Sequence, residues 1–186
     1  MKQIFQNLKK IFRKGSILTM RPTIKLLVGC PASGKTSWAS EMERHAVLFN
    51  EVFPAYVSRD DIRFKLIKET EEYFSKEKEV FNTFINTIQE LIDDRYPLII
   101  VDATHVTKAS RKKVLSQLDL KDYKVDIVVI RPSLETCLAR NAKRQGRACV
   151  PETAIINMYN SYEQPTEEEF DYIKGNKGSI FLYEIG

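Results

Sequence analysis

Residues 29–36 restrict what this 186-residue chain can fold into more than any other feature. They match G-x-x-x-x-G-K-[ST] at every fixed position, the pattern of a loop that wraps backbone N–H groups around phosphate oxygens. An apolar run at 24–28 predicts a buried strand before the loop, and 36–42 predict a helix after it. Free N–H groups and the helix dipole attract anions to such a junction. The motif therefore predicts nucleoside triphosphate binding, against the alternative of a chance match in an ordinary strand–turn–helix.

The residue types of the motif have separate physical roles. Glycine at Gly29 and Gly34 allows backbone angles and a close approach that a side chain would block. Lys35 would bridge the β- and γ-phosphates, and the Thr36 hydroxyl would be a ligand of Mg²⁺. The residues predicted to bind the nucleotide here are Gly29, Cys30, Pro31, Ala32, Ser33, Gly34, Lys35 and Thr36.

Charge divides the chain into two predicted parts. Residues 1–21 form an extension with six basic residues and no acidic one, and 22–186 form a single predicted domain. The net charge of +4 becomes −2 for the domain, which has 23 basic and 25 acidic residues. Such a domain would contact nucleic acid locally and not through a broad basic face. We expect the extension to be loosely ordered; a membrane-surface, partner-docking, nucleic-acid-binding or organelle-targeting role is the alternative.

Composition excludes several classes of protein. Charged residues make up 29% and apolar residues 43% of the chain, as in ordinary soluble proteins, and no apolar stretch is long enough to span a bilayer. The three cysteines match neither a disulfide framework nor a metal-ligand spacing, which suits a reducing cytosol and predicts a cytoplasmic location. Two histidines are too few for a His-rich metal site.

Strands and helices are predicted to alternate from residue 23 onward. With the phosphate loop, this alternation predicts an α/β P-loop NTPase fold: a mainly parallel five-stranded sheet with helices on both faces. The predicted strands lie near 24–28, 55–57, 97–101, 123–130 and 179–183. The predicted helices lie near 36–42, 62–67, 76–94, 110–117, 133–143 and 151–163.

Asp102 is the second strong signal, because it ends the apolar run at 97–101. P-loop folds present a carboxylate to the nucleotide's Mg²⁺ from such a position. An ionised carboxylate at the end of a buried strand needs a partner, and a metal ion or the Thr36 hydroxyl would supply one. The alternative is an aspartate that caps Thr104 or a nearby turn.

A block of alternating charge at 58–63 follows the second predicted strand. Of its two adjacent carboxylates, one can accept a proton from an attacking hydroxyl, while an arginine fork holds an acceptor phosphate. This pattern predicts acceptor chemistry. In the alternative, Asp60 caps the helix while Asp61 and Arg63 lie on its surface.

A basic cluster follows the fourth predicted strand. Its members are Arg140, Lys143, Arg144 and Arg147. Arg140 and Arg144 are four residues apart, which predicts one face of a helix. Arginines on a mobile segment can close over transferring phosphates as a lid and accelerate transfer by about 10³–10⁵. A solvated basic surface is the alternative.

In order and spacing, these motifs resemble the 5′-kinase domain of bacteriophage polynucleotide kinase and related single-domain AAA-type P-loop kinases. The likeness covers roughly residues 22–175 and extends to the tail at 158–171. The motifs that carry it are 29–36, Arg59-Asp60-Asp61-x-Arg63, Val101-Asp102-x-Thr104-His105, and Arg140-Asn141-x-x-Arg144 through Val150-Pro151.

The resemblance implies specific roles for these residues. Lys35, Asp60 and Arg144 would be catalytic, with Asp60 as the general base on a 5′-hydroxyl and Arg144 against the donor phosphates. Arg140 would join the nucleotide-binding residues, while Thr36 and Asp102 would hold the metal. The residues implied to bind the acceptor are Arg59, Asp61, Arg63 and Thr104.

The chain also departs from the family pattern. Ala32 replaces a usual glycine, which should tighten the loop without removing an N–H donor. Ala103 and His105 replace asparagines, which leaves acceptor recognition there open. The 3′-phosphatase domain of the phage enzyme, with its D-x-D motif, is absent, so the chain should phosphorylate 5′ ends without trimming 3′ phosphates.

The sequence as a whole therefore predicts an ATP- and Mg²⁺-dependent 5′-hydroxyl polynucleotide kinase whose acceptor is a DNA or RNA end. A P-loop kinase of a small hydroxylic metabolite or nucleoside is the first alternative, and a nucleotide-dependent switch or ATPase module is the second. Against a GTPase switch, the N-K-x-D motif is missing. Against an AAA-type motor, the chain is too short for the usual helical lid domain.

Overall fold

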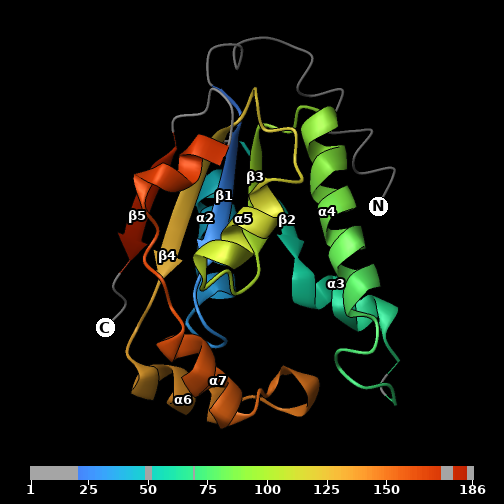
Figure 1. Cartoon of the computed structure of the whole chain (residues 1–186), viewed down its shortest axis with the longest axis vertical. Coiled ribbons are helices and arrows are strands. Elements are labelled where there is room, and N and C mark those ends of the chain that lie inside the picture. Colours follow the sequence, from blue (N-terminus) through green and yellow to red (C-terminus); the bar gives the residue numbers. More distant parts are fainter. Residues whose placement is uncertain (1–20, 49–51, 69, 173–177, 184–186) are drawn as a thin grey trace.

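The computed structural model describes residues 21–48, 52–68, 70–172 and 178–183, so the predicted N-terminal extension, apart from Arg21, lies outside the described residues. Five strands form one sheet in the order β2-β3-β1-β4-β5, and every pairing is parallel (Figure 1). The strands are β1 (Thr23–Val28), β2 (Ala55–Ser58), β3 (Leu98–Asp102), β4 (Lys124–Ile130) and β5 (Ser179–Tyr183). The predicted five-stranded parallel sheet is confirmed.

The helices alternate with these strands as the sequence predicts. They are α2 (Lys35–Leu48), α3 (Arg59–Leu66), α4 (Glu77–Asp93), α5 (Lys108–Leu115), α6 (Leu134–Ala142) and α7 (Glu152–Asn160), with 3₁₀ turns η1 (Gly146–Ala148) and η2 (Glu167–Tyr172). Helix α3 begins earlier than predicted, because Ser58 caps it: the Asp61 N–H donates to Ser58 Oγ at 3.1 Å. Within the described part of the chain, no helix has the length and apolarity to cross a membrane.

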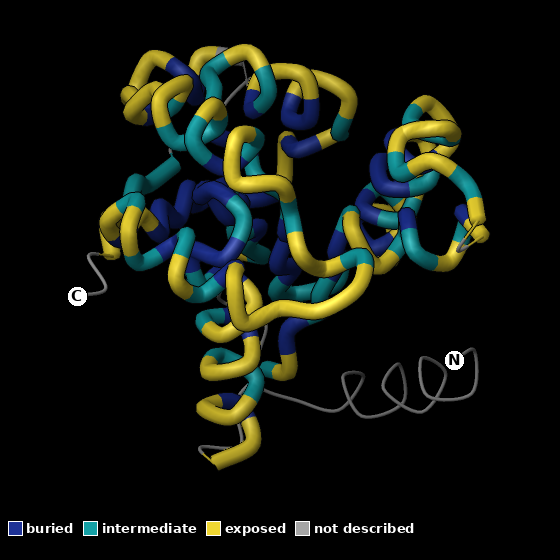
Figure 2. Tube along the Cα trace, turned by 90° about the horizontal axis from the view of Figure 1, so that it is seen from below, coloured by how far each residue is buried: buried dark blue, intermediate teal, exposed yellow. Residues whose placement is uncertain are grey.

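Two apolar cores lie on opposite faces of the sheet, since alternate residues of a strand point to opposite sides. Ile24, Leu26 and Val28 join the larger core, which packs against α4 and α5, while Leu27 joins the smaller core with Ala39 of α2. Figure 1 shows α2 behind the sheet and α5 in front, and Figure 2 shows the buried segments surrounded by exposed ones. The predicted covering of both faces is confirmed, and it explains why the central strands are mostly apolar.

The register of the central strands aligns their carboxyl ends. Asp102 pairs with Leu27 of β1 on one side and with Ser58 of β2 on the other. The segments that follow these strands therefore leave the sheet along one edge. They are the phosphate loop, the stretch after Asp102, and the start of α3.

His105 fixes the loop after β3 to β1. Its backbone lies in the left-handed region, with φ at 46°, and its Nδ1–H donates to the carbonyl of Leu27 at 2.9 Å. The ring is buried, and within the described residues its Nε2 has no hydrogen-bond partner. Burial lowers the pKa of His105 from its ordinary 6.5 to about 4.

This buried imidazole makes stability depend on pH. The unfolded chain takes up a proton near pH 6.5 and the folded one only near pH 4, so stability falls as pH drops through that window, by about 3 kcal/mol in total. We expect His105→Asn, whose side chain tolerates the left-handed backbone, to flatten this dependence. Urea unfolding of both proteins between pH 7.5 and pH 4.5 measures it. Equal losses of unfolding free energy in the two proteins would contradict the assignment of this pH dependence to His105.

A buried ion pair holds the next segment in place. The Arg111 guanidinium donates twice to Glu169, at 2.7 Å each, and once to the carbonyl of His105 at 3.0 Å. Both side chains are almost fully buried, at 0% and 1% exposure. The pair thereby connects α5, η2 and the loop that carries His105.

Loss of one partner leaves the other charge buried. We expect Arg111→Met to lower the free energy of unfolding by about 3–5 kcal/mol, and an added Glu169→Leu to recover part of that loss. Lys121→Met is the matched control, because its pair with Asp119 is exposed and is worth at most about 1 kcal/mol. Urea denaturation of the four proteins checks this, and a small Arg111→Met effect would contradict it.

Candidate active site

The phosphate loop joins β1 to α2 as the motif predicts. The Gly29 N–H donates to the carbonyl of Thr104 at 2.9 Å, and a Cβ on Gly29 would lie 2.4 Å from the carbonyl oxygen of Ile130. Gly34 has φ at 110°, outside the range of other residues, and its carbonyl accepts the Trp38 N–H at 2.9 Å. Both glycines are therefore needed for the loop to fit against the sheet and enter the helix.

Ala32, the departure from the family pattern, lies in the left-handed region with φ at 63°. A residue with a Cβ adopts this conformation at a cost of about 1 kcal/mol, whereas glycine adopts it freely. This explains physically why glycine is usual here. The alanine keeps its N–H, so the loop's set of phosphate donors is unchanged.

Lys35 folds back over the loop. Its Nζ donates to the carbonyls of Gly29 and Cys30 at 2.9 and 3.0 Å, and the side chain is buried. The ammonium is thus held at the inner side of the loop, where a bound phosphate would compete with the two carbonyls for it.

Two cysteines that are far apart in sequence meet under the loop. Cys30 Sγ donates to Cys137 Sγ of α6 at 3.2 Å, and both thiols are free and buried. This hydrogen bond, together with burial, raises the pKa of Cys30. The same hydrogen bond lowers the pKa of Cys137 to about 7, although burial opposes that shift. The contact links the phosphate loop to α6, the helix that carries Arg140 of the basic cluster.

Asp102 accepts two hydrogen bonds at Oδ2. The Tyr56 hydroxyl donates at 2.5 Å and the Thr36 hydroxyl at 3.4 Å. Burial raises the pKa of Asp102, although the charge of Lys35 opposes the shift, and the negative charge of Asp60 raises it further. The Thr36 partner is the one that the sequence predicts. Asp60 also lies close enough to Asp102 to repel its charge.

Thr36 and Asp102 fit a magnesium site by their chemistry. Both present oxygen, which Mg²⁺ prefers, and a buried carboxylate with a raised pKa gains from a nearby cation. Among the described residues no cluster of three or more acidic, histidine or cysteine ligands exists. Two protein ligands suffice where substrate phosphates and water complete the shell.

The predicted acceptor block forms a hydrogen-bonded cluster at the start of α3. Asp60 Oδ1 accepts from Arg63 Nη1 at 2.6 Å and from the Tyr73 hydroxyl at 2.8 Å. The Asp60 side chain remains 64% exposed, whereas that of Arg63 is 5% exposed. Burial and the charge of Asp60 raise the pKa of Tyr73 to about 12, so its hydroxyl keeps the proton it donates.

Glu77, the first residue of α4, holds both arginines of this block. Its Oε1 pairs with Arg59, and its Oε2 accepts from Arg63 Nη2 at 2.6 Å. Burial alone would lower the pKa of Arg63, but its hydrogen bond to Glu77 and the surrounding negative charge raise it. The Arg59 guanidinium also lies 5.3 Å from the ring centre of Phe81. Arg59 and Arg63 are therefore oriented by α4 before any substrate binds.

The basic cluster spans the two sides of the site. Arg140 donates to the carbonyl of Ser33 in the phosphate loop at 3.1 Å, and Arg147 donates to the carbonyl of Ile67 at the end of α3 at 3.3 Å. Arg144 lies between them in sequence, is exposed, and donates to the carbonyl of Ala148 at 3.4 Å. The predicted lid segment thus contacts both halves of the site.

The prediction that Arg140 and Arg144 share one helix face is wrong. Helix α6 ends at Ala142, and Arg144 lies in the turn beyond it. Asn141 causes the break: its side chain donates to the carbonyl of Val150 at 2.7 Å and accepts the Val150 N–H at 3.0 Å. These bonds fold the chain back on itself, so it cannot continue as a helix.

The structure brings most, but not all, of the predicted site together. Asp61 has an exposed side chain, and Thr104 contacts Gly29 through its backbone carbonyl, so their predicted acceptor roles stay predictions. Sequence reasoning missed Tyr56, Tyr73 and Glu77. A tyrosine at a strand end and an acidic residue in the first turn of a helix are weak signals, since both occur for structural reasons alone.

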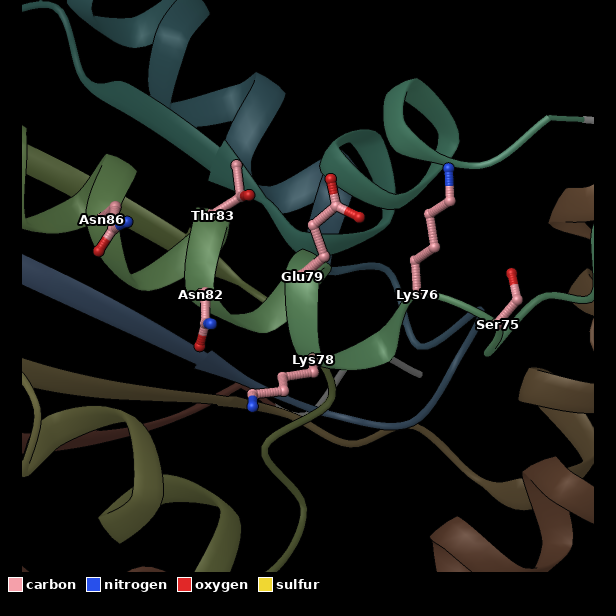
Figure 3. Close-up of a pocket in the computed structure, with 7 residues that line it drawn as sticks. All are labelled: Ser75, Lys76, Lys78, Glu79, Asn82, Thr83 and Asn86. Atoms are coloured by element: carbon pink, nitrogen blue, oxygen red, sulfur yellow. The ribbon is translucent and has the colours of Figure 1, made fainter.

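A surface hollow of about 450 Å³ lies along α4, away from the phosphate loop (Figure 3). In Figure 3, Lys78 and Asn82 extend to one side of the helix, and Lys76 and Glu79 to the other. Lys76 donates to the carbonyl of Leu66 at 2.9 Å and so joins the start of α4 to α3. The residues that line the hollow are Ser75, Lys76, Lys78, Glu79, Asn82, Thr83 and Asn86.

Solved structures share this fold. One chain of the Pnkp1/Rnl/Hen1 RNA repair complex is 22% identical, with a TM-score of 0.64 over 80% of this chain; the match spans only 46% of that chain. Kti12 of Chaetomium thermophilum, in complex with ADP-AlF3, is 14% identical with a TM-score of 0.59, covering 87% of this chain and 88% of its own. A sugar kinase from Janibacter sp. HTCC2649 is 14% identical with a TM-score of 0.56, covering 87% and 85%.

The family comparison covers the same region as the site. The AAA domain family matches residues 24–165, from β1 through the phosphate loop, Asp102 and the basic cluster. This range agrees with the stretch of roughly 22–175 over which the sequence resembles P-loop kinases. The structural match to a chain of the RNA repair complex also supports that resemblance. A match over this length shows that the chain belongs to the AAA domain family and has the kinase-like P-loop phosphotransferase fold that its sequence predicts.

Proposed function

We propose that this protein is an ATP-dependent kinase that transfers the γ-phosphoryl group to the 5′-hydroxyl end of a DNA or RNA strand. The observation that carries the proposal is the position of Asp60. It lies in the first turn of α3, at the same sheet edge as the phosphate loop, and is close enough to Asp102 to raise its pKa. This position supports a role for Asp60 as the proton acceptor beside a triphosphate bound at the loop.

The donor side would use groups of the loop and the basic cluster. Loop N–H groups and Lys35 would hold the phosphates, and Arg140 and Arg144 would offset the charge that develops during transfer. Thr36 and Asp102 would hold Mg²⁺, which, when bound, offsets charge on the phosphate oxygens. Little covalent chemistry falls to the protein, so positioning and electrostatics supply most of the acceleration.

The acceptor side would use Asp60 as the proton acceptor. Within the described residues its hydrogen bonds from Arg63 and Tyr73 reach Oδ1, which leaves Oδ2 to take the proton of the attacking hydroxyl. These bonds orient the carboxylate, and its exposure gives a substrate access. Arg63 would hold the adjacent acceptor phosphate, which would displace part of the contact between Arg63 and Glu77.

A kinase of a small hydroxylic metabolite is the rival, since the sugar kinase aligns with this chain over nearly its full length. Such an enzyme would use Asp60 in the same way but would have no need of a strand. Incubation with [γ-³²P]ATP and a panel of 5′-OH DNA, 5′-OH RNA, nucleosides and sugars separates the two. The proposal is supported if only the DNA or RNA strands are labelled. It would be overturned if a small acceptor is labelled and single-stranded oligonucleotide does not inhibit that labelling.

The role of Asp60 predicts a selective loss of transfer. We expect Asp60→Asn to reduce phosphoryl transfer by about 10²–10⁴ while ATP binding stays intact, because the amide cannot take the proton. Single-turnover transfer and equilibrium binding of a fluorescent ATP analogue measure the two effects. Asp93→Asn is the matched control, as Asp93 lies at the far end of α4 and bonds to Gln89 on the surface. Near-normal transfer by Asp60→Asn would refute the assignment.

A further inference from the structure

We propose that Tyr73 and Phe74 form a platform on which the nucleobase of the acceptor's 5′-terminal nucleotide stacks. The inference rests on the proposed function and names how that site would recognise a strand. Both residues lie in the segment between α3 and α4, beside the proposed general base.

Tyr73 is bonded directly to the proposed general base, and Phe74 packs against Tyr73. The Tyr73 hydroxyl donates to Asp60 Oδ1 at 2.8 Å, and the Tyr73 ring meets the Phe74 ring edge to face, with centroids 4.8 Å apart. Tyr73 is partly buried, whereas Phe74 is 65% exposed. A large apolar ring is therefore presented to solvent next to the tyrosine that bonds to the proposed general base. The reacting oxygen and the base of one nucleotide would then meet adjacent parts of the same cluster.

Buried charge holds the platform in place. The Arg63 guanidinium lies 4.4 Å from the centre of the Tyr73 ring and 5.6 Å from that of Phe74, and Glu77 fixes the guanidinium in turn. Phe64 of α3 contacts Tyr73 edge to face at 6.3 Å. Because Arg63 contacts both rings and Phe64 contacts Tyr73, little side-chain freedom remains to be lost when a base binds. The platform is preorganised.

Charge indicates why a base is the occupant. Residues 22–186 carry a net charge of −2, so this part of the chain has no overall excess of positive charge with which to attract a strand. Affinity must come from local contacts, and stacking on an aromatic ring is the sequence-tolerant contact that single strands offer. A sugar has no flat π face to present. A strand whose base covers Phe74 while its terminal hydroxyl reaches Asp60 uses both features at once.

The first test compares acceptor kinetics for two 5′-OH oligonucleotides, one with adenine and one with an abasic site at the 5′ end. We expect Phe74→Ala to raise KM for the adenine strand by about 5- to 150-fold, which corresponds to about 1–3 kcal/mol, with little change in kcat. The abasic strand should show a similarly high KM with the unmodified protein, and Phe74→Ala should add nothing to it. Phe74→Tyr should restore tight binding.

The matched control removes an exposed ring elsewhere. Phe181 is 38% exposed and lies on β5, at the opposite edge of the sheet from β2 and the helix that follows it. Phe181→Ala should leave KM for both strands unchanged. If Phe181→Ala raised KM for the strands as much as Phe74→Ala does, the effect would be a general loss of packing and the platform would be rejected.

The second test reads stacking without any transfer. A 5′-OH oligonucleotide with 2-aminopurine at its first position should lose fluorescence on binding to the unmodified protein and retain it with Phe74→Ala. Efficient transfer to strands with equal KM for the adenine and abasic forms, and no quenching, would overturn the platform while leaving the proposed function intact. Absence of transfer to any strand, with transfer to a small acceptor, would overturn both.

Discussion

The alignment of three strand ends is the constraint on which the rest of this structure depends. Because β1, β2 and β3 are parallel and Asp102 pairs with both Leu27 and Ser58, the segments after them emerge at one edge of the sheet. A register slip of one residue would turn Asp102 to the other face of the sheet, away from Thr36 and Tyr56. His105 and Arg111 then hold the loop after β3 in place through bonds that are buried. The positions of the site residues therefore depend first on the register of the sheet.

Charge balance within the site is the second organising principle. Arg63 is nearly buried, and a buried guanidinium needs partners, which Asp60, Glu77 and Tyr73 supply. The same contacts that stabilise the cation also orient the exposed carboxylate of Asp60. An acceptor phosphate that approaches Arg63 would have to compete with Glu77, so an anionic acceptor must bring further contacts of its own to bind well. Recognition by several weak local contacts fits a domain without excess positive charge.

The sequence was sufficient for the fold and for half of the site. Strand periodicity and the G-x-x-x-x-G-K-T motif predicted the parallel sheet, the phosphate loop and the contact of Thr36 with Asp102, because each follows from a local sequence pattern. The hydrogen bond of Tyr56 to Asp102 and the ion pairs of Glu77 with two arginines link residues from different elements. No local sequence pattern reveals such contacts. The prediction that Arg140 and Arg144 share one helix face was wrong because the Asn141 side chain bonds to the backbone nine residues later, and the helix ends at Ala142.

The contacts of the lid segment tie the two halves of the site into one unit. Arg140 and Arg147 bind backbone carbonyls, of Ser33 on the donor side and of Ile67 on the acceptor side, so their partners carry no signature in the sequence. The Arg147 guanidinium also lies 4.7 Å from the centre of the Phe64 ring, which in turn contacts Tyr73. A chain of contacts therefore runs from the phosphate loop, through the lid, to the aromatic residues beside Asp60. Because Arg144 lies between these two anchors in sequence, a shift of α3 would also change the position of this arginine, which is proposed to contact the donor phosphates.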